Sequence, residues 1–165
     1  TKVIEAAWSQ APHPELAAAY GDLAGEDEAP LNRVKRFQRL HSLRPDHSES
    51  HFALAEANLA AQLWGEARRH LEQSEPVPRS VRVLRLLADL EEQEHGDLNA
   101  ARRWLDEAAT APMEDAWYCD SCGSIAGQWG ASCASCNSFA TLSWQSPPGQ
   151  RMTPPTALPA TETAE

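Results

Sequence analysis

The sequence predicts an all-α protein of repeated helical hairpins, followed by a small four-cysteine metal module and a disordered tail. Three observations predict this class: a segment that recurs after 34 residues, two Cys-x-x-Cys pairs, and a last segment rich in Pro and Thr. The changes in composition place the helical repeats in residues 1–115, the module in residues 116–144 and the tail in residues 145–165. The tail has too few apolar residues to offset the entropy of ordering it.

The overall charge of the chain is acidic. Its 165 residues include 14 Lys and Arg against 24 Asp and Glu, which gives a formal net charge of −10. A surface of this charge repels phosphate polyanions and anionic membranes, so we expect no nucleic-acid partner. The chain has no run of about 18 apolar residues, and its start lacks both Met and the apolar stretch of a signal peptide. We therefore expect a fragment of a longer protein that makes no membrane contact of its own.

The repeat is clearest between residues 63–78 and residues 97–112, which are 34 positions apart. This displacement aligns Ala67 with Ala101, Arg68 with Arg102, Leu71 with Leu105 and Pro78 with Pro112. A copy in residues 14–47 is degenerate, because Arg33 stands where the other copies have a small alanine. Residues 2–10 predict the closing helix of a copy whose start is missing.

A helix is expected before each of the two clear copies. Residues 50–64 and residues 81–96 both carry apolar side chains at helical spacing. Gly65 and Gly96 are expected in the turns between paired helices, and Asp97 as the N-cap of the helix that follows. Each repeat is therefore predicted to be helix, turn, helix.

A unit of this kind resembles the tetratricopeptide repeat. The resemblance rests on small residues near Ala55 and Ala67, a bulky residue at Leu71 and a closing Pro. Small side chains let two helices approach closely, and the Pro ends one unit before the next begins. A plain helical bundle is the alternative interpretation.

The first helices of two neighbouring copies are expected to line a concave groove for a protein partner. The residues at the corresponding positions are Glu49, Phe52, Glu56 and Leu59 in one helix and Arg82, Arg85, Asp89 and Glu92 in the next. In this interpretation Phe52 is an apolar anchor among charges that set orientation. Reversing the charge of both arginines should then leave thermal stability nearly unchanged. The alternative is that Phe52 belongs to the core between the helices and that the arginines pair with nearby acids such as Glu56.

The two cysteine pairs are typical of a metal site. Cys119 and Cys122 form one pair and, ten residues later, Cys133 and Cys136 form the other, so that two tight turns can close a tetrahedron of thiolates. Gly123 and Asn137 follow the pairs, where such a turn needs a positive φ. We expect Zn²⁺ at these four residues, with iron as the alternative because both metals accept tetrahedral sulfur. Two disulfides are a further alternative, which the absence of cysteine from the helical part disfavours.

Aromatic residues are dense in the module and are expected to form its small core. They are Trp117, Tyr118, Trp129, Phe139 and Trp144. A base-stacking role is disfavoured because no Lys or Arg occurs between Ala116 and Gln150 to contact phosphate. The six histidines are scattered along the chain without a ligand spacing, so we expect ordinary surface or core histidines.

The segments "WYCDSCG", "CASCN" and "FATLSW" are similar to a shortened rubredoxin-type knuckle domain. Helical repeats that end in such a domain resemble two related bacterial families. One comprises the LapB-type regulators of lipopolysaccharide synthesis, and the other the alphaproteobacterial HemY-type tetratricopeptide proteins associated with haem biosynthesis. Phrases such as "PHPELAAAY" and "EEQEHGDLNAARRWLDEAATAP" are most similar to the HemY type.

The resemblance implies a biological setting. It implies a membrane anchor in a missing N-terminal part, with the repeats and the module at the cytoplasmic face of the bacterial inner membrane. Only the four cysteines carry over a residue role from the family, as metal ligands. We therefore expect a non-catalytic scaffold or adaptor linked to haem (porphyrin) biosynthesis, which binds protein partners through its repeats. The alternatives are a rubredoxin-like iron electron-transfer module and a LapB-type regulator.

Overall fold

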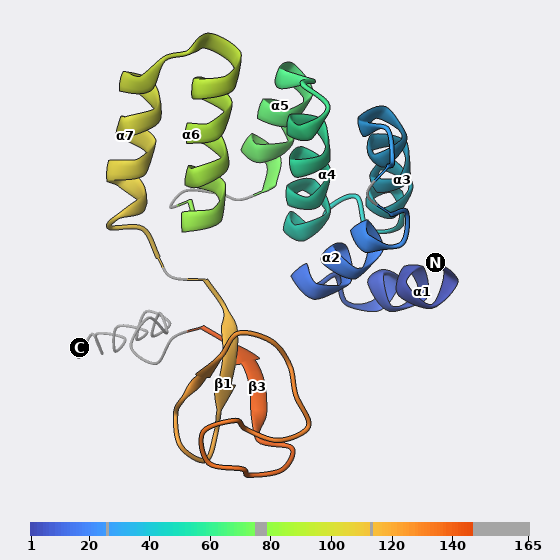
Figure 1. Ribbon diagram of the computed structural model, residues 1–165, viewed down its shortest axis with the longest axis vertical. Helices are drawn as coiled ribbons and strands as arrows, with labels where there is room; N and C mark the ends of the chain where they lie inside the picture. Colours follow the sequence, from blue (N-terminus) through green and yellow to red (C-terminus); the bar gives the residue numbers. More distant parts are fainter. Residues whose placement is uncertain (26, 75–78, 113, 147–165) are drawn as a thin grey trace, which may run out of the picture. The chain divides into compact units, whose positions relative to one another are not determined.

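The structure is a computed structural model that describes residues 1–25, 27–74, 79–112 and 114–146. The chain divides into two compact units, Thr1–Met113 and Glu114–Glu165. The first unit is helical and the second contains a small sheet (Figure 1). Residues 147–165 of the predicted tail lie outside the described residues. The same holds for Pro78, which the repeat alignment used. The prediction of a mostly helical protein with a small cysteine-bearing part is confirmed.

Seven helices make up the described part of the first unit. They are α1 (Lys2–Gln10), α2 (Pro14–Asp22), α3 (Pro30–Leu43), α4 (Ser48–Ala60), α5 (Trp64–Ser74), α6 (Val81–His95) and α7 (Leu98–Ala108). The helices recur at a constant interval, because α5 begins 34 residues after α3 and 34 residues before α7. None of the helices in the described ranges combines the length and apolar character needed to cross a bilayer.

Helix α4 lies at the centre of the helical unit. It packs against α5, and it also contacts α2, α3 and α6. Helices α6 and α7 run side by side as the next pair (Figure 1). Two core clusters result: one contains Trp8, Tyr20, Phe37, Leu40 and Leu54, and the other contains Phe52, Ala67, Leu71, Leu87 and Leu90.

The small residues of the repeat lie where helices approach closely. Ala67 and Ala101 are both buried, as their position in the repeat predicts. The bulky residues that follow them in the repeat differ in exposure, because Leu71 is buried whereas Leu105 is half exposed. The difference in exposure arises because α5 is packed between α4 and α6, whereas α7 is packed against α6. A terminal helix of a stack keeps an open side.

The turns between paired helices are only partly as predicted. Gly96 adopts φ +65° at the end of α6, and the Asp97 side chain accepts hydrogen bonds from the backbone N–H groups of Asn99 and Ala100. The prediction for Gly65 is wrong, because Gly65 lies inside α5. The left-handed residue of that turn is Gln62, with φ +58°, because α4 already ends at Ala60.

The degenerate copy compensates for its large residue at the alanine position. Arg33 of α3 packs toward α2, where Gly21 supplies the missing space. A Cβ atom at Gly21 would lie 2.8 Å from an Arg33 guanidinium nitrogen. The same guanidinium lies 5.1 Å from the centre of the Phe37 ring. In this copy the small residue between the two helices is therefore Gly21 of α2, and not an alanine at the position of Arg33 in α3.

The second unit is built on an antiparallel sheet of three short strands. They are β1 (Ala116–Cys119), β2 (Ile125–Ala126) and β3 (Leu142–Gln145), with β1 in the centre. Trp117 of β1 lies opposite Trp144 of β3, and their rings meet edge to face at 5.3 Å. The sheet brings the first cysteine pair, at the end of β1, beside the segment that leads from the second pair into β3.

The expectation that all five aromatic residues form the core of this unit is wrong for two of them. Tyr118 is buried, and Trp117 and Trp144 are partly buried. Trp129 and Phe139, however, are 58% and 75% exposed. A unit this small has too little volume to enclose five large rings, so only those on or beside the central strand are covered.

Candidate functional site

The four cysteines converge in the second unit. The sulfur atoms of Cys119 and Cys136 are 3.7 Å apart, and those of Cys122 and Cys133 are 3.8 Å apart. All four sulfurs lie within 4.8 Å of one another. A tetrahedral ion with metal–sulfur bonds of about 2.3 Å separates its sulfur ligands by about 3.8 Å. The cluster therefore has the donor set and the spacing to hold a metal ion.

Each cysteine pair forms the same tight turn. The backbone N–H of Gly123 donates to the carbonyl of Cys119, and that of Asn137 donates to the carbonyl of Cys133, both at 2.8 Å. Gly123 has φ +72° and Asn137 has φ +57°, so the predicted positive φ is confirmed at both positions. Glycine and asparagine are the residues that tolerate this conformation at least cost.

The two cysteines of a pair differ in exposure. Cys119 and Cys133 are both buried at 1% exposure, whereas Cys122 and Cys136 are exposed. The burial anchors one sulfur of each turn inside the unit and leaves the other at the surface. One edge of the cluster therefore reaches solvent.

Hydroxyl groups around the sulfurs were not anticipated from the sequence. The Ser124 Oγ atom lies 3.1 Å from the Cys122 sulfur and 3.3 Å from the Cys133 sulfur. The Thr141 Oγ1 atom lies 3.2 Å from the Cys119 sulfur. A signal was present, because both turns follow the pattern Cys-x-Ser-Cys-x-Ser, in residues 119–124 and 133–138. Such contacts orient ligands and stabilise them in the deprotonated form.

The electrostatic surroundings favour thiolates at the two buried cysteines. The hydrogen bond with Ser124, together with the backbone groups of Cys136 and Ser135, lowers the pKa of Cys133 to about 6. The hydrogen bond with Thr141 is the main cause that lowers the pKa of Cys119. Because the thiolate is the form that binds a metal, this environment suits a metal site. Zinc and iron both accept four thiolates.

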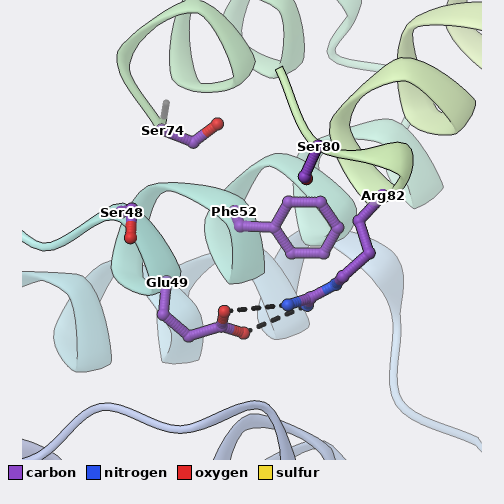
Figure 2. Close-up of a pocket in the computed structure, with 6 residues that line it drawn as sticks. All are labelled: Ser48, Glu49, Phe52, Ser74, Ser80 and Arg82. Carbon is purple, nitrogen blue, oxygen red and sulfur yellow. Dashed lines mark hydrogen bonds and ion pairs between the residues drawn. The ribbon is translucent and has the colours of Figure 1, made fainter. Parts of the chain in front are cut away.

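Two residues expected to line the partner groove lie in the core instead. Phe52 and Leu59 are 5% and 7% exposed and belong to the second core cluster. Arg82 covers the Phe52 ring, with its guanidinium carbon 3.7 Å from the ring centre, and pairs with Glu49 at 2.9 and 3.1 Å (Figure 2). These contacts match the alternative interpretation, in which Phe52 is a core residue. The helical unit itself therefore covers most of the Phe52 and Leu59 side chains.

The other expected groove residues lie at the surface. Glu56, Arg85, Asp89 and Glu92 are exposed. Glu56 and Arg82 line a hollow to which α2 and α3 also contribute. The residues that line it are Pro14, Ala17, Ala18, Asp22, Arg33, Phe37, Ala53, Glu56 and Arg82. Helix α2 was not among the elements expected to line a groove, although it is the first helix of the degenerate copy and begins 34 residues before α4.

The fold and the cysteine cluster together define a mostly helical protein with a small sheet that can hold a metal ion. The chain is similar to "Probable magnetosome protein Mms48" of Magnetospirillum gryphiswaldense, with 32% identity over 143 residues. The match covers 86% of the chain, but the chain spans only about a third (32%) of the length of this curated relative. No model of a known protein family matches the chain, and no solved structure does.

Proposed function

We propose that the chain is a protein-binding scaffold of tetratricopeptide-type repeats that carries a structural zinc module. The observation that carries the proposal is the hollow on the helical unit, because the first helices of successive hairpins line it. Helices α2 and α4 both contribute, and Arg82 adds the start of α6. A stack of hairpins that presents its first helices along one concave side is the form in which helical repeats bind extended partners.

The lining of the hollow suits a segment of another protein. Its floor includes the buried Phe37, Ala17 and Ala53, and its rim carries both signs of charge. Asp22 and Glu56 supply negative charge, and Arg33 and Arg82 supply positive charge. A small apolar centre with a mixed polar rim is typical of protein interfaces. A purely anionic ligand would meet repulsion from the two acids.

Filling the hollow tests the scaffold proposal. Ala18 is exposed and lines the hollow, whereas Ala19 is exposed on the same helix and does not line it. We expect Ala18→Arg to reduce capture of the native protein partner about tenfold or more, because the long side chain occupies the docking space. Ala19→Arg adds the same charge and is expected to capture the partner like the unchanged chain.

Quantitative pull-down measures capture of the partner, and circular dichroism checks that each variant is folded. Three results are informative. Loss of capture with Ala18→Arg alone supports docking in the hollow. Equal capture by both variants places the partner elsewhere and contradicts the proposal. Equal loss in both variants would show that added positive charge on α2, and not occupancy of the hollow, governs binding.

The biological setting of this scaffold is proposed from resemblance alone. The similarity to HemY-type proteins favours a role linked to haem (porphyrin) biosynthesis at the cytoplasmic face of the inner membrane, with a LapB-type role as its alternative. The relative's name favours a magnetosome setting instead. The observation that favours the magnetosome setting is the match to that relative. Fractionating cells that express the natural protein and following it with an antibody separates the settings.

Electron transfer with iron at the four cysteines is a second candidate function. It is favoured by the exposure of Cys122 and Cys136, because an electron carrier needs an accessible cluster edge. We nevertheless expect zinc in the working protein and therefore no visible absorption or redox couple. Metal analysis of protein isolated at native expression level, with voltammetry, checks this expectation. A reversible one-electron couple that passes electrons to a cellular partner would overturn the structural role of the module.

A further inference from the structure

Three histidines from three helices meet in the first unit. His41 lies on α3, His51 on α4 and His70 on α5. Their ring centres are 4.7 to 5.3 Å apart, and one ring nitrogen of each lies within 4.8 Å of one ring nitrogen of each of the others. These three histidines are therefore close together in space, although they are scattered along the sequence. The sequence gives no motif because the residues come together only through helix packing.

The nitrogen atoms of this cluster have the spacing of metal ligands. The Nδ1 atoms of His51 and His70 are 3.0 Å apart. Two imidazoles that bind one tetrahedral ion through bonds of about 2.0–2.1 Å hold their nitrogens about 3.3 Å apart. The Nε2 atom of His41 is buried and has no hydrogen-bond partner among the described residues. A buried, unpaired nitrogen is costly in a protein core and is explained if it binds a ligand.

We propose that His41, His51 and His70 form a second metal site, which takes a divalent first-row transition metal such as Zn²⁺. Three imidazoles are a donor set that suits zinc, copper, iron and nickel. Three protein ligands leave a coordination position for water or another small ligand, as in open zinc sites. The site differs from the cysteine cluster in its donor atoms and lies in the other unit of the chain.

The protonation state of the rings supports metal binding. Burial is the main cause that lowers the pKa of all three histidines, and it lowers that of His70 to about 4. At neutral pH the rings are therefore uncharged, and each has one nitrogen lone pair. The backbone carbonyl of Pro45 accepts a hydrogen bond from His51, a contact of the kind that fixes ligand histidines in place.

Charged groups around the cluster act in opposite directions. The Arg69 guanidinium lies 3.1 Å from the Nε2 atom of His70 and opposes a bound cation. Asp46 is exposed, and its negative charge acts on His41 and His51. Because Arg69 is half exposed and also pairs with Glu66, its side chain can turn toward solvent. Metal binding at Nδ1 of His70 then moves the proton from Nδ1 to Nε2, where Arg69 had donated.

The unchanged chain provides the first test. The whole chain, with its four-cysteine site saturated with zinc, is titrated with further Zn²⁺, and the six histidine rings are followed by ¹⁵N NMR. We expect one additional equivalent of zinc to shift the ring nitrogens of three histidines and to leave those of the other three unchanged. Absence of a shift at His41, His51 and His70, or binding at other histidines only, would overturn the proposal. The alternative that these outcomes would favour is a polar cluster held by an N–H···N bond.

Two ligand variants and one control provide the second test. His51→Gln and His70→Gln are each expected to weaken the additional zinc site on the order of 100-fold or more, because loss of a ligand costs at least as much as loss of an outer contact. His95→Gln is the matched control, because His95 is exposed on α6 and pairs with Glu94. Zinc binding that survives both ligand variants in folded protein contradicts the site. If these variants unfold, the NMR titration alone decides.

A substitution of Arg69 is expected to strengthen zinc binding, whereas the ligand variants weaken it. Arg69→Gln removes a positive charge beside the site and is expected to tighten zinc binding about tenfold. A merely structural histidine cluster would show no such gain. Isothermal titration of the chain with its cysteine site already loaded measures the change. Weaker zinc binding in this variant would contradict the assignment of His70 as a ligand.

Discussion

Replacing Cys133 by serine is expected to release the metal of the four-cysteine site and to unfold residues 116–144. Cys133 is buried and its sulfur lies 3.8 Å from that of Cys122, so a serine oxygen would neither complete the thiolate set nor match its bond lengths. The sheet of the second unit has three short strands, and two large aromatic residues outside the sheet, Trp129 and Phe139, are exposed. A unit with so small a core depends on its metal for stability.

Metal content and circular dichroism measure this effect. We expect complete loss of the bound metal and almost unchanged helical dichroism, because the helical unit has its own core clusters. Ala134→Ser is the matched control, since it introduces serine at an exposed position of the same turn and keeps all four thiolates. Loss of the helical signal in Cys133→Ser would show that the two units fold as one.

The second large effect is expected from Arg82→Glu, which should destabilise the helical unit by about 2–3 kcal/mol. The change removes the guanidinium that covers Phe52 and leaves Glu49 facing a second carboxylate (Figure 2). Both partners of the present pair are partly buried, so solvent screens their interaction less than at an open surface. This prediction differs from the expectation from sequence, in which reversal of both arginines leaves thermal stability nearly unchanged.

Arg85→Glu is the matched control for this prediction. Arg85 is exposed one turn along the same helix, and its reversal is expected to change stability by at most about 0.5 kcal/mol. Thermal unfolding followed at 222 nm should show a fall of about 10 °C for Arg82→Glu and almost none for Arg85→Glu. Equal melting temperatures for the two variants would mean that the contacts of Arg82 with Glu49 and Phe52 add nothing to stability.

Features that depend on local chemistry could be predicted from the sequence. The 34-residue recurrence is found by aligning the sequence with itself, and the helices are predicted by apolar side chains at helical spacing. Gly96, Asp97, Gly123 and Asn137 have the conformations expected of them. Each of these depends on neighbours within a few positions. Gly65 is the exception, because α4 ends early and shifts the left-handed residue to Gln62.

Features that depend on which elements pack together could not be predicted in this way. Phe52 looked like a surface anchor because the pattern of α4 has apolar side chains on several faces, and only the contacts with α5 and α6 decide which are covered. The exposure of Trp129 and Phe139 depends likewise on the volume that the second unit can enclose.

The helical hairpins and the four-thiol cluster could be predicted from the residue pattern alone. Each helix and each Cys-x-x-Cys turn depends on residues that are close together along the chain, so its geometry follows from local conformation. Packing between helices, by contrast, places Arg82 over a core ring and α2 along the hollow, and it brings His41, His51 and His70 together. These three histidines are separated by 10 and 19 positions and lie on different helices. The packing of α3, α4 and α5 brings their nitrogens within reach of one ion, and no local pattern records it.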